Sequence, residues 1–452
     1  MMDTYSLLID VFFWLLSGII LIKYFERRVG VGLVATYFLQ LFILFGIGGL
    51  LYCIPEYAEI SSVDTQLVVA GFQQSTYAIV SFIVGAFFLA PSMKSMNIDK
   101  RKASFYFSYG LPVFLILLGM VSFFLRNIIF ISSLIALVCG FNQLLLAGIV
   151  LGVWQAHLKN HPYAKNIFIM LFLLPPFASL IFQGFLGFGA LASFTLIMFL
   201  YSSFPSKKSY LILLLIGYLL FSFFSVYLEN RNEFRRVAWS GGDTLSTISA
   251  MEELFVGGFQ LFDLQKLDID SLKLIDSRLN QNILLGKSVH YLDRGYEGFA
   301  KGETLIDAVL ALIPRILWPD KPMVGGSGDL MSRYTGEQFA VGTSIGITSV
   351  IEAYINFGTY GVISIFLFLG ILMGHIDRKA KHALCEGDQE RFILWYLPGL
   401  GFLQVGGSFV EVTSTVFSLL FVAWITVFWL RLKKKKYRLV YKKQPGPTYV
   451  SS

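Results

Sequence analysis

Charged side chains are scarce in this chain. Only 14% of its 452 residues are Asp, Glu, Lys or Arg, whereas 56% are hydrophobic and 16% are aromatic. A soluble domain with so few charges would leave most of its surface apolar, so this composition excludes a soluble protein. It predicts a polytopic membrane protein whose outer surface faces lipid.

Cysteine and histidine are also rare, with three and five residues. Cys53, Cys139 and Cys385 fall at the end of an apolar stretch, inside one and in a polar connection, which excludes a disulfide framework. His157 and His161 have the spacing of a zinc-protease helix but lack the Glu that such a motif places between them. We therefore predict no metal site and no other cofactor.

Residues 1–24 lack the basic start and small-residue cleavage site of a signal peptide, so we expect the first apolar stretch to be a retained span. Similar stretches recur along the chain, each of roughly the 20 residues that a helix needs to cross the hydrocarbon. They do not alternate as barrel strands do, so we predict an all-α bundle of about 11 transmembrane helices. The expected spans are residues 5–23, 31–52, 67–90, 106–125, 128–153, 166–183, 185–204, 209–228, 359–376, 392–409 and 412–430.

Basic residues gather on one side of this topology. Cytoplasmic connections retain Lys and Arg, whereas translocated ones do not. With the N-terminus outside, one side holds most of the 36 basic residues but few of the 29 acidic ones. These basic residues are Lys23, Arg27, Arg28, Lys159, Lys165, Lys207, Lys208 and those of the 94–102 loop, the 378–381 loop and the 431–443 tail. The net charge of +7 thus indicates contact with membrane lipids and gives no reason to expect nucleic acid.

The topology divides the chain into four parts: residues 1–228 with spans one to eight, residues 229–343 as a large external loop, residues 344–430 with a re-entrant or interfacial segment and spans nine to eleven, and residues 431–452 as a basic cytoplasmic tail. Apolar residues recur at helical spacing in the external loop, which predicts short amphipathic helices on the membrane or over the bundle. The expected stripes are Ile248, Met251, Phe255, Phe259 and Phe262, then Leu272, Ile275 and Leu279.

A third short helix is expected over residues 303–314, where Thr304 and Asp307 have the spacing of a capping box. It leads into the run 312-LIPRILWPDKP-322, in which Arg315, Trp318 and Lys321 lie on a proline-stiffened segment. A guanidinium fork matches phosphate oxygens, so this run predicts a phosphate site at headgroup depth. The alternative is a plain interfacial anchor.

Two further groups in the external loop carry cations. Arg231, Arg235 and Arg236 follow a span directly, and cations outside the membrane favour an anionic partner. The alternative is local pairing with Glu229 and Glu233 at helical spacing.

The second group is the glycine-rich run 324–336, which ends near Arg333 and Tyr334 and has amides that can hold phosphate. The alternative is an ordinary flexible turn.

Glu352 lies among apolar residues before the ninth span, where an ionisable group is costly unless it is paired or functional. We interpret it as a general base or an arginine partner, with purely structural pairing as the alternative. His290 is a weaker candidate from the same outer side.

Two runs resemble those of Wzy-type O-antigen or exopolysaccharide repeat-unit polymerases: Pro-Arg-x-x-Trp-Pro-x-Lys-Pro at 314–322 and Glu-x-Tyr-x-Asn-Phe-Gly-x-x-Gly at 352–361. The many spans, with a large external loop before the last three, are similar as well. The residues that match the two runs are Arg315, Trp318, Lys321, Glu352, Tyr354, Asn356 and Gly358.

The resemblance implies a glycosyltransferase of the bacterial inner membrane, with a periplasmic N-terminus and external loop and a cytoplasmic C-terminus. It would move a growing glycan from undecaprenyl pyrophosphate onto a lipid-linked repeat unit, alongside a chain-length regulator and a flippase. Arg315 would stabilise the leaving group, and Glu352 or Glu233 would act as base. The residues expected to bind substrate are Arg231, Arg235, Arg236, Trp318, Lys321, Arg333, Tyr334, Tyr354 and His290.

Three alternatives stay open. An O-antigen ligase has the same layout and donor but a different acceptor. A flippase for lipid-linked oligosaccharides is expected to carry charges inside its spans rather than in one external loop. A non-enzymatic scaffold would tolerate alanine at Arg315.

Overall fold

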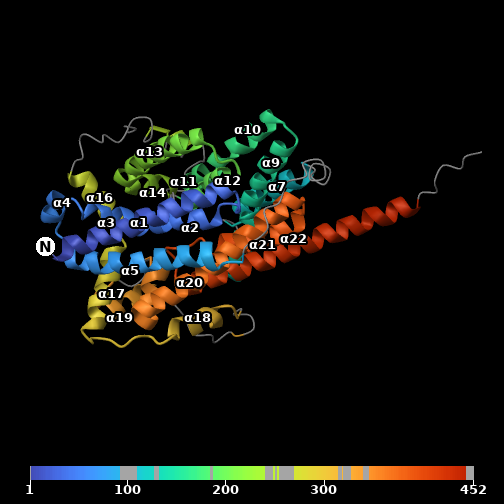
Figure 1. Ribbon diagram of the computed structural model, residues 1–452. Helices are drawn as coiled ribbons and strands as arrows, with labels where there is room; N and C mark the ends of the chain where they lie inside the picture. The colour runs from blue at the N-terminus through green and yellow to red at the C-terminus, as the bar shows by residue number, and fades with distance from the viewer. Residues whose placement is uncertain are drawn as a thin grey trace, which may run out of the picture.

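The computed structural model describes residues 2–91, 109–126, 132–183, 187–239, 248–249, 252–253, 269–313, 318, 327–339 and 346–443. All regular secondary structure in these ranges is helical, which confirms the all-α prediction. Long helices run side by side in one elongated bundle (Figure 1).

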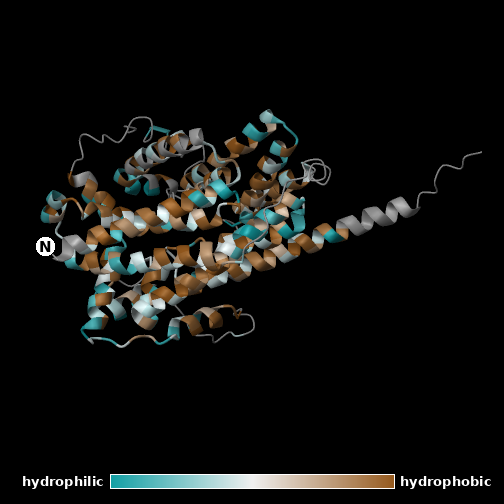
Figure 2. Cartoon of the chain, viewed as in Figure 1, coloured by the Kyte–Doolittle hydropathy of each residue, from teal (hydrophilic) through white to brown (hydrophobic). Residues whose placement is uncertain are grey.

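Seven helices within the described ranges are long and apolar enough to cross a membrane. Hydrophobic residues predominate along these helices (Figure 2), and many of them are exposed, as on α1, where Phe12 and Leu15 are 60% and 63% exposed. Such a surface suits lipid rather than water. The chain is therefore a membrane protein with transmembrane helices. The seven candidate spans are Ser6–Arg27, Leu33–Leu51, Thr65–Leu89, Leu134–Leu158, Pro162–Phe182, Ser349–Glu386 and Phe409–Leu432.

Helices occupy each expected stretch of the first half. They are α1 (Met2–Arg27), α2 (Leu33–Leu41), η1 (Phe42–Gly46), α3 (Ile47–Leu51), α4 (Pro55–Ile60), α5 (Thr65–Val84), η2 (Gly85–Leu89), α7 (Gly110–Leu125), α8 (Ser132–Asn142), α9 (Leu144–Leu158), α10 (Pro162–Met170), η3 (Leu171–Leu173), α11 (Leu174–Gln183), α12 (Gly187–Ser203) and α13 (Lys207–Glu229). Helix α11 is described to Gln183 and packs against α12, so the structure describes two helices on either side of the expected break.

The loop between α13 and the last long helices contains α14 (Arg231–Trp239), α16 (Ile269–Leu279), α17 (Asn282–Asp293), α18 (Glu303–Ala311) and α19 (Ser327–Thr335). The stripe of Leu272, Ile275 and Leu279 is confirmed, since α16 buries all three. Of the other stripe only Ile248 is described. Met251, Phe255, Phe259 and Phe262 lie outside the described residues.

Two local predictions in this loop are wrong. Thr304 and Asp307 form no capping box, because Gly302, with φ of 95°, occupies the N-cap of α18 and no side chain caps it. Thr304 is instead buried and accepts a hydrogen bond from Asn356 Nδ2. Residues 327–335 are helix α19 rather than a flexible turn, so Arg333 and Tyr334 lie on a helix.

Helix α17 packs deeply into the bundle against α5 rather than on a lipid surface. A Cβ added at Gly286 would lie 1.8 Å from the carbonyl oxygen of Leu67, and one at Gly71 would lie 2.1 Å from that of Asn282. Small residues let membrane helices approach this closely. The 229–343 segment is therefore tied to the membrane bundle through α17.

The C-terminal part consists of α20 (Ser349–Glu386), α21 (Gln389–Gly401) and α22 (Phe409–Lys443). Helix α20 bends at Phe357 and Gly358, and Gly358 has a φ of 63° that favours glycine. The end of the expected span 392–409 is wrong, because α21 has only 13 residues and ends at Gly401.

The expected cytoplasmic loop 378–381 is also wrong, because these residues continue α20 and are mostly buried. Arg378 donates to the carbonyl oxygens of Ala86, Ala90 and Pro91, where η2 ends. A cation there satisfies carbonyls that lack a partner within the helix. Arg378, a basic side chain that a hydropathy pattern assigns to water, thus binds protein backbone.

We expect Gly286→Leu to destabilise the protein, because the added side chain has to push α17 away from α5. Overpacking of this kind costs about 1–3 kcal/mol. Thermal unfolding of the protein in detergent would show a lower Tm. Gly217→Leu on α13 is the matched control, since a Cβ there meets nothing within 4 Å. Equal Tm values for the two variants would contradict the tight α5–α17 contact.

Candidate functional site: a cleft beside two buried helix starts

Helices α20 and α22 begin next to one another inside the bundle. The amide of Ser349 donates to the carbonyl oxygen of Val405 over 3.1 Å, which joins the start of α20 to the segment before α22. Ser408 and Glu411 cap α22 reciprocally, each side chain accepting from the amide of the other. Irregular backbone at this depth is tolerated only where protein groups satisfy it or where it lines a cavity.

Glu352 binds the start of α22. Its Oε2 accepts from the amide of Phe409 over 2.6 Å, the Thr304 hydroxyl bonds to the same carboxylate, and the residue is 1% exposed. The positive end of the α22 dipole favours a carboxylate in this place. No Lys or Arg pairs with Glu352 among the described residues, so the arginine-partner interpretation has no support there.

Asn356 fastens α18 to α20. Its Nδ2 donates to Thr304 Oγ1 over 2.7 Å, and its Oδ1 accepts from the amide of Gly302 over 3.0 Å. The Asn356 side chain is fully buried. These bonds hold the start of α18 against the first half of α20, so Glu352 and Asn356 together position α18, α20 and α22.

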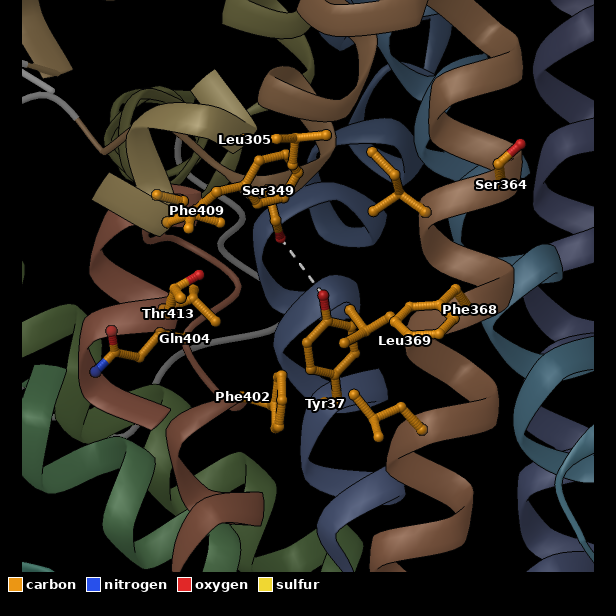
Figure 3. Close-up of a pocket in the computed structure, with 15 residues that line it drawn as sticks. Tyr37, Leu305, Ser349, Ser364, Phe368, Leu369, Phe402, Gln404, Phe409 and Thr413 are labelled. Carbon is orange, nitrogen blue, oxygen red and sulfur yellow. Dashed lines mark hydrogen bonds between the residues drawn. The ribbon is translucent and has the colours of Figure 1, made fainter. Parts of the chain in front are cut away.

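A cleft of about 470 Å³ lies between α18, α20 and the segment that joins α21 to α22. Its walls are mainly apolar (Figure 3), and Tyr37 Oη and Ser349 Oγ, 3.4 Å apart, lie at its inner side. Phe368 and Val309 both line the cleft and are 66% and 64% exposed. The cleft therefore opens on the apolar outer surface and can take an apolar chain.

The carboxylate of Asp307 lies on α18, the helix that covers this cleft. Burial, and then the neighbouring Glu303, raise the pKa of Asp307. Asp307 is partly exposed and has no hydrogen bond to the described part of the chain. An accessible carboxylate with a raised pKa is suited to accept a proton. From the sequence we predicted only a helix-capping role for Asp307.

Arg231 and Arg235 on α14 and Arg278 on α16 form a basic cluster. Partial desolvation, and then the like charges of Arg231 and Arg235, lower the pKa of Arg278. Arg278 was not predicted from the sequence as a site residue, although it lies in the last turn of the helix that carries the stripe of Leu272, Ile275 and Leu279. Arg236 instead pairs with Glu233 on the same helix, as the local-pairing alternative has it.

The remaining candidates from the 229–343 segment and α20 either have protein partners or are only partly exposed. Arg333 pairs with Glu297 at 3.2 Å and with Glu303 at 3.3 Å, while Tyr334 is fully buried. The Tyr354 hydroxyl donates to Asp293 over 2.9 Å. His290 on α17 and Trp318 are both partly exposed, and Arg315 and Lys321 lie outside the described residues.

The candidates thus fall into two groups. Hydrogen bonds and ion pairs connect Glu352, Tyr354 and Arg333 with the ends of α17 and α18. The basic cluster and Glu233 lie on the other side of α1 and α5 from α18 (Figure 1). The described candidates therefore lie in two separate parts of the bundle.

We expect Glu352→Ala to lower the Tm, because the buried amide of Phe409 loses its acceptor, which costs about 1–3 kcal/mol. Glu352→Gln keeps an acceptor oxygen, so its Tm should lie between those of the wild type and the alanine variant. Glu59→Ala, at an exposed position on α4, is the control. If Glu352→Ala were as stable as this control, Glu352 would not hold α22 in place.

Over residues 56–434 the chain matches the family model described as a domain of unknown function (DUF8712). No curated protein and no solved structure matches it. Because the family model covers most of the sequence, the chain belongs to the DUF8712 family.

Proposed function

We propose that the protein is a membrane glycosyltransferase that polymerises lipid-linked oligosaccharide repeat units, as its resemblance to Wzy-type polymerases implies. The observation that carries the proposal is the apolar cleft, which opens toward lipid and is covered by α18. Helix α18 ends at Ala311, directly before the run with Arg315. A polyprenyl chain in the cleft would bring its pyrophosphate to that run.

The proposed setting is a bacterial inner membrane crossed by about 11 helices, with the N-terminus and the 229–343 loop in the periplasm. Figure 1 supports this arrangement, because the N-terminus, α16, α17 and α19 lie at one end of the bundle and α22 projects from the other. Residues 431–443, which continue α22, would carry the basic charge of the tail to the cytoplasmic lipid surface.

In the proposed reaction, the bond between the glycan anomeric carbon and the pyrophosphate oxygen breaks, and undecaprenyl pyrophosphate leaves with the bonding electrons. A hydroxyl of the incoming repeat unit forms the new glycosidic bond and loses its proton to a base. Pyrophosphate is a good leaving group, so cations at Arg315 and Lys321 matter more than a general acid.

We assign the base role to Asp307 rather than Glu352. Glu352 is buried and already accepts from Phe409, whereas Asp307 is partly exposed on the helix that covers the cleft. A positioned base contributes about 10²- to 10⁴-fold to such a step. Glu233, the other expected base, is paired with Arg236 on the far side of α1 and α5.

Deletion of the protein should leave cells with single repeat units on their lipid acceptor instead of a ladder of long chains. Loss of all surface glycan would point to a ligase or flippase instead. An unchanged ladder would rule out the polymerase proposal.

Arg315→Ala should not restore the ladder at normal protein level, and Arg315→Lys should restore it poorly, because an ammonium loses the bidentate fork. Asp307→Asn should slow chain growth on the order of 10²- to 10⁴-fold. Asp329→Asn, an exposed acid on α19, is the matched control. Normal ladders with Asp307→Asn would remove the base assignment, and normal ladders with Arg315→Ala would leave only an interfacial anchor at that run.

A further inference from the structure

Four exposed aromatic side chains lie at the bend of α20 or on the segment that joins α17 to α18, and we call them the aromatic patch. They are Tyr296, Phe299, Phe357 and Tyr360, which are 62%, 39%, 44% and 84% exposed. A Cβ at Gly358 would touch the Phe299 ring at 3.4 Å, and one at Gly302 would touch the Phe357 ring at 3.4 Å. The two rings therefore cover the bend, with Tyr360 one helical turn further along.

Charged side chains are interleaved with these rings. Asp293, Arg294, Lys301 and Glu303 are exposed, and Glu297 is partly exposed. Figure 2 shows hydrophilic colours along the segment that joins α17 to α18. A lipid-facing surface carries few charges, as in the middle of α1, where Phe12, Leu15 and Ile19 are exposed. The mixture of rings and charges therefore favours a ligand that is both apolar and rich in hydroxyl groups.

We propose that the aromatic patch is a docking surface for the sugar rings of the substrate glycan, an inference that rests on the proposed function. A pyranose presents a face of C–H groups that packs on an aromatic ring, while its hydroxyls bind carboxylates. Asp293, which accepts from Tyr354, and Glu297, which pairs with Arg333, each keep a carboxylate oxygen with further acceptor capacity, and Lys301 supplies a donor. Exposed aromatic side chains give large contact area at low entropic cost.

The position of the patch agrees with this occupant. Gly302 is the N-cap of α18, a Cβ added there would lie 3.4 Å from the Phe357 ring, and its amide donates to Asn356 on α20. Leu305 and Val309 of the same helix line the cleft. One short helix thus connects the cleft proposed for the lipid chain with the patch, as a lipid-linked oligosaccharide requires.

The test uses the purified full-length protein in nanodiscs and short oligosaccharides released by partial hydrolysis of the source strain's own surface polysaccharide. Saturation-transfer NMR and calorimetry would measure their binding. The double variant Tyr296→Ala/Tyr360→Ala should bind on the order of 10-fold more weakly than wild type. Tyr163→Ala on α10 is the matched control, because Tyr163 is also 84% exposed, and it should bind as wild type does.

In cells, the double variant should shift the glycan ladder to shorter chains, because a weakly held glycan leaves after fewer additions. Unchanged binding and an unchanged ladder would overturn the docking inference while the polymerase proposal stands. A double variant that binds oligosaccharide normally but loses its stable insertion in vesicles would show an interfacial anchor, which also overturns it. A ladder that survives deletion of the protein would instead remove the proposed function.

Discussion

The fold depends on one constraint, which is that backbone groups at helix breaks inside the bundle have no water to bind. Side chains distant in sequence satisfy them. Asn282 Nδ2 donates to the carbonyl oxygen of Phe45 in the π-helical turn η1 over 2.8 Å, and such turns leave a carbonyl without its usual partner. Asp377 accepts from the amides of Val31 and Leu33 over 2.9 and 3.0 Å, where α1 turns into α2. Each break is thus fixed to a second element.

Helix α20 supplies most of these groups and so links the fold to the candidate site. Arg378 and Asp377 bind the chain at one end of α20, and Asn356 and Glu352 bind α18 and α22 at the other. The cleft lies along the outer face of the same helix, next to Phe368. A change in the bend at Gly358 would therefore alter the cleft and the position of α18 together.

Composition and hydropathy predicted the helical class, the membrane setting and the helix positions, because burial of apolar side chains in lipid is a local property of each stretch. They did not predict which side chains bind the backbone groups at the helix breaks. Asp377 lies 346 residues from Val31, so no local pattern connects the two, and Arg378 looked like an ordinary loop cation. Glu352 was found because a carboxylate among apolar residues is costly, but its partner, the Phe409 amide, has no signal in the sequence.

The most direct measurement is reconstitution of the purified protein in proteoliposomes that contain undecaprenyl-pyrophosphate-linked repeat units extracted from the deletion strain. If the account is right, glycan chains longer than one repeat unit form without added nucleotide, and undecaprenyl pyrophosphate is released in proportion to the bonds made. Movement of the lipid-linked unit across the bilayer without chain growth would contradict it. So would an absence of both products from protein that is correctly folded.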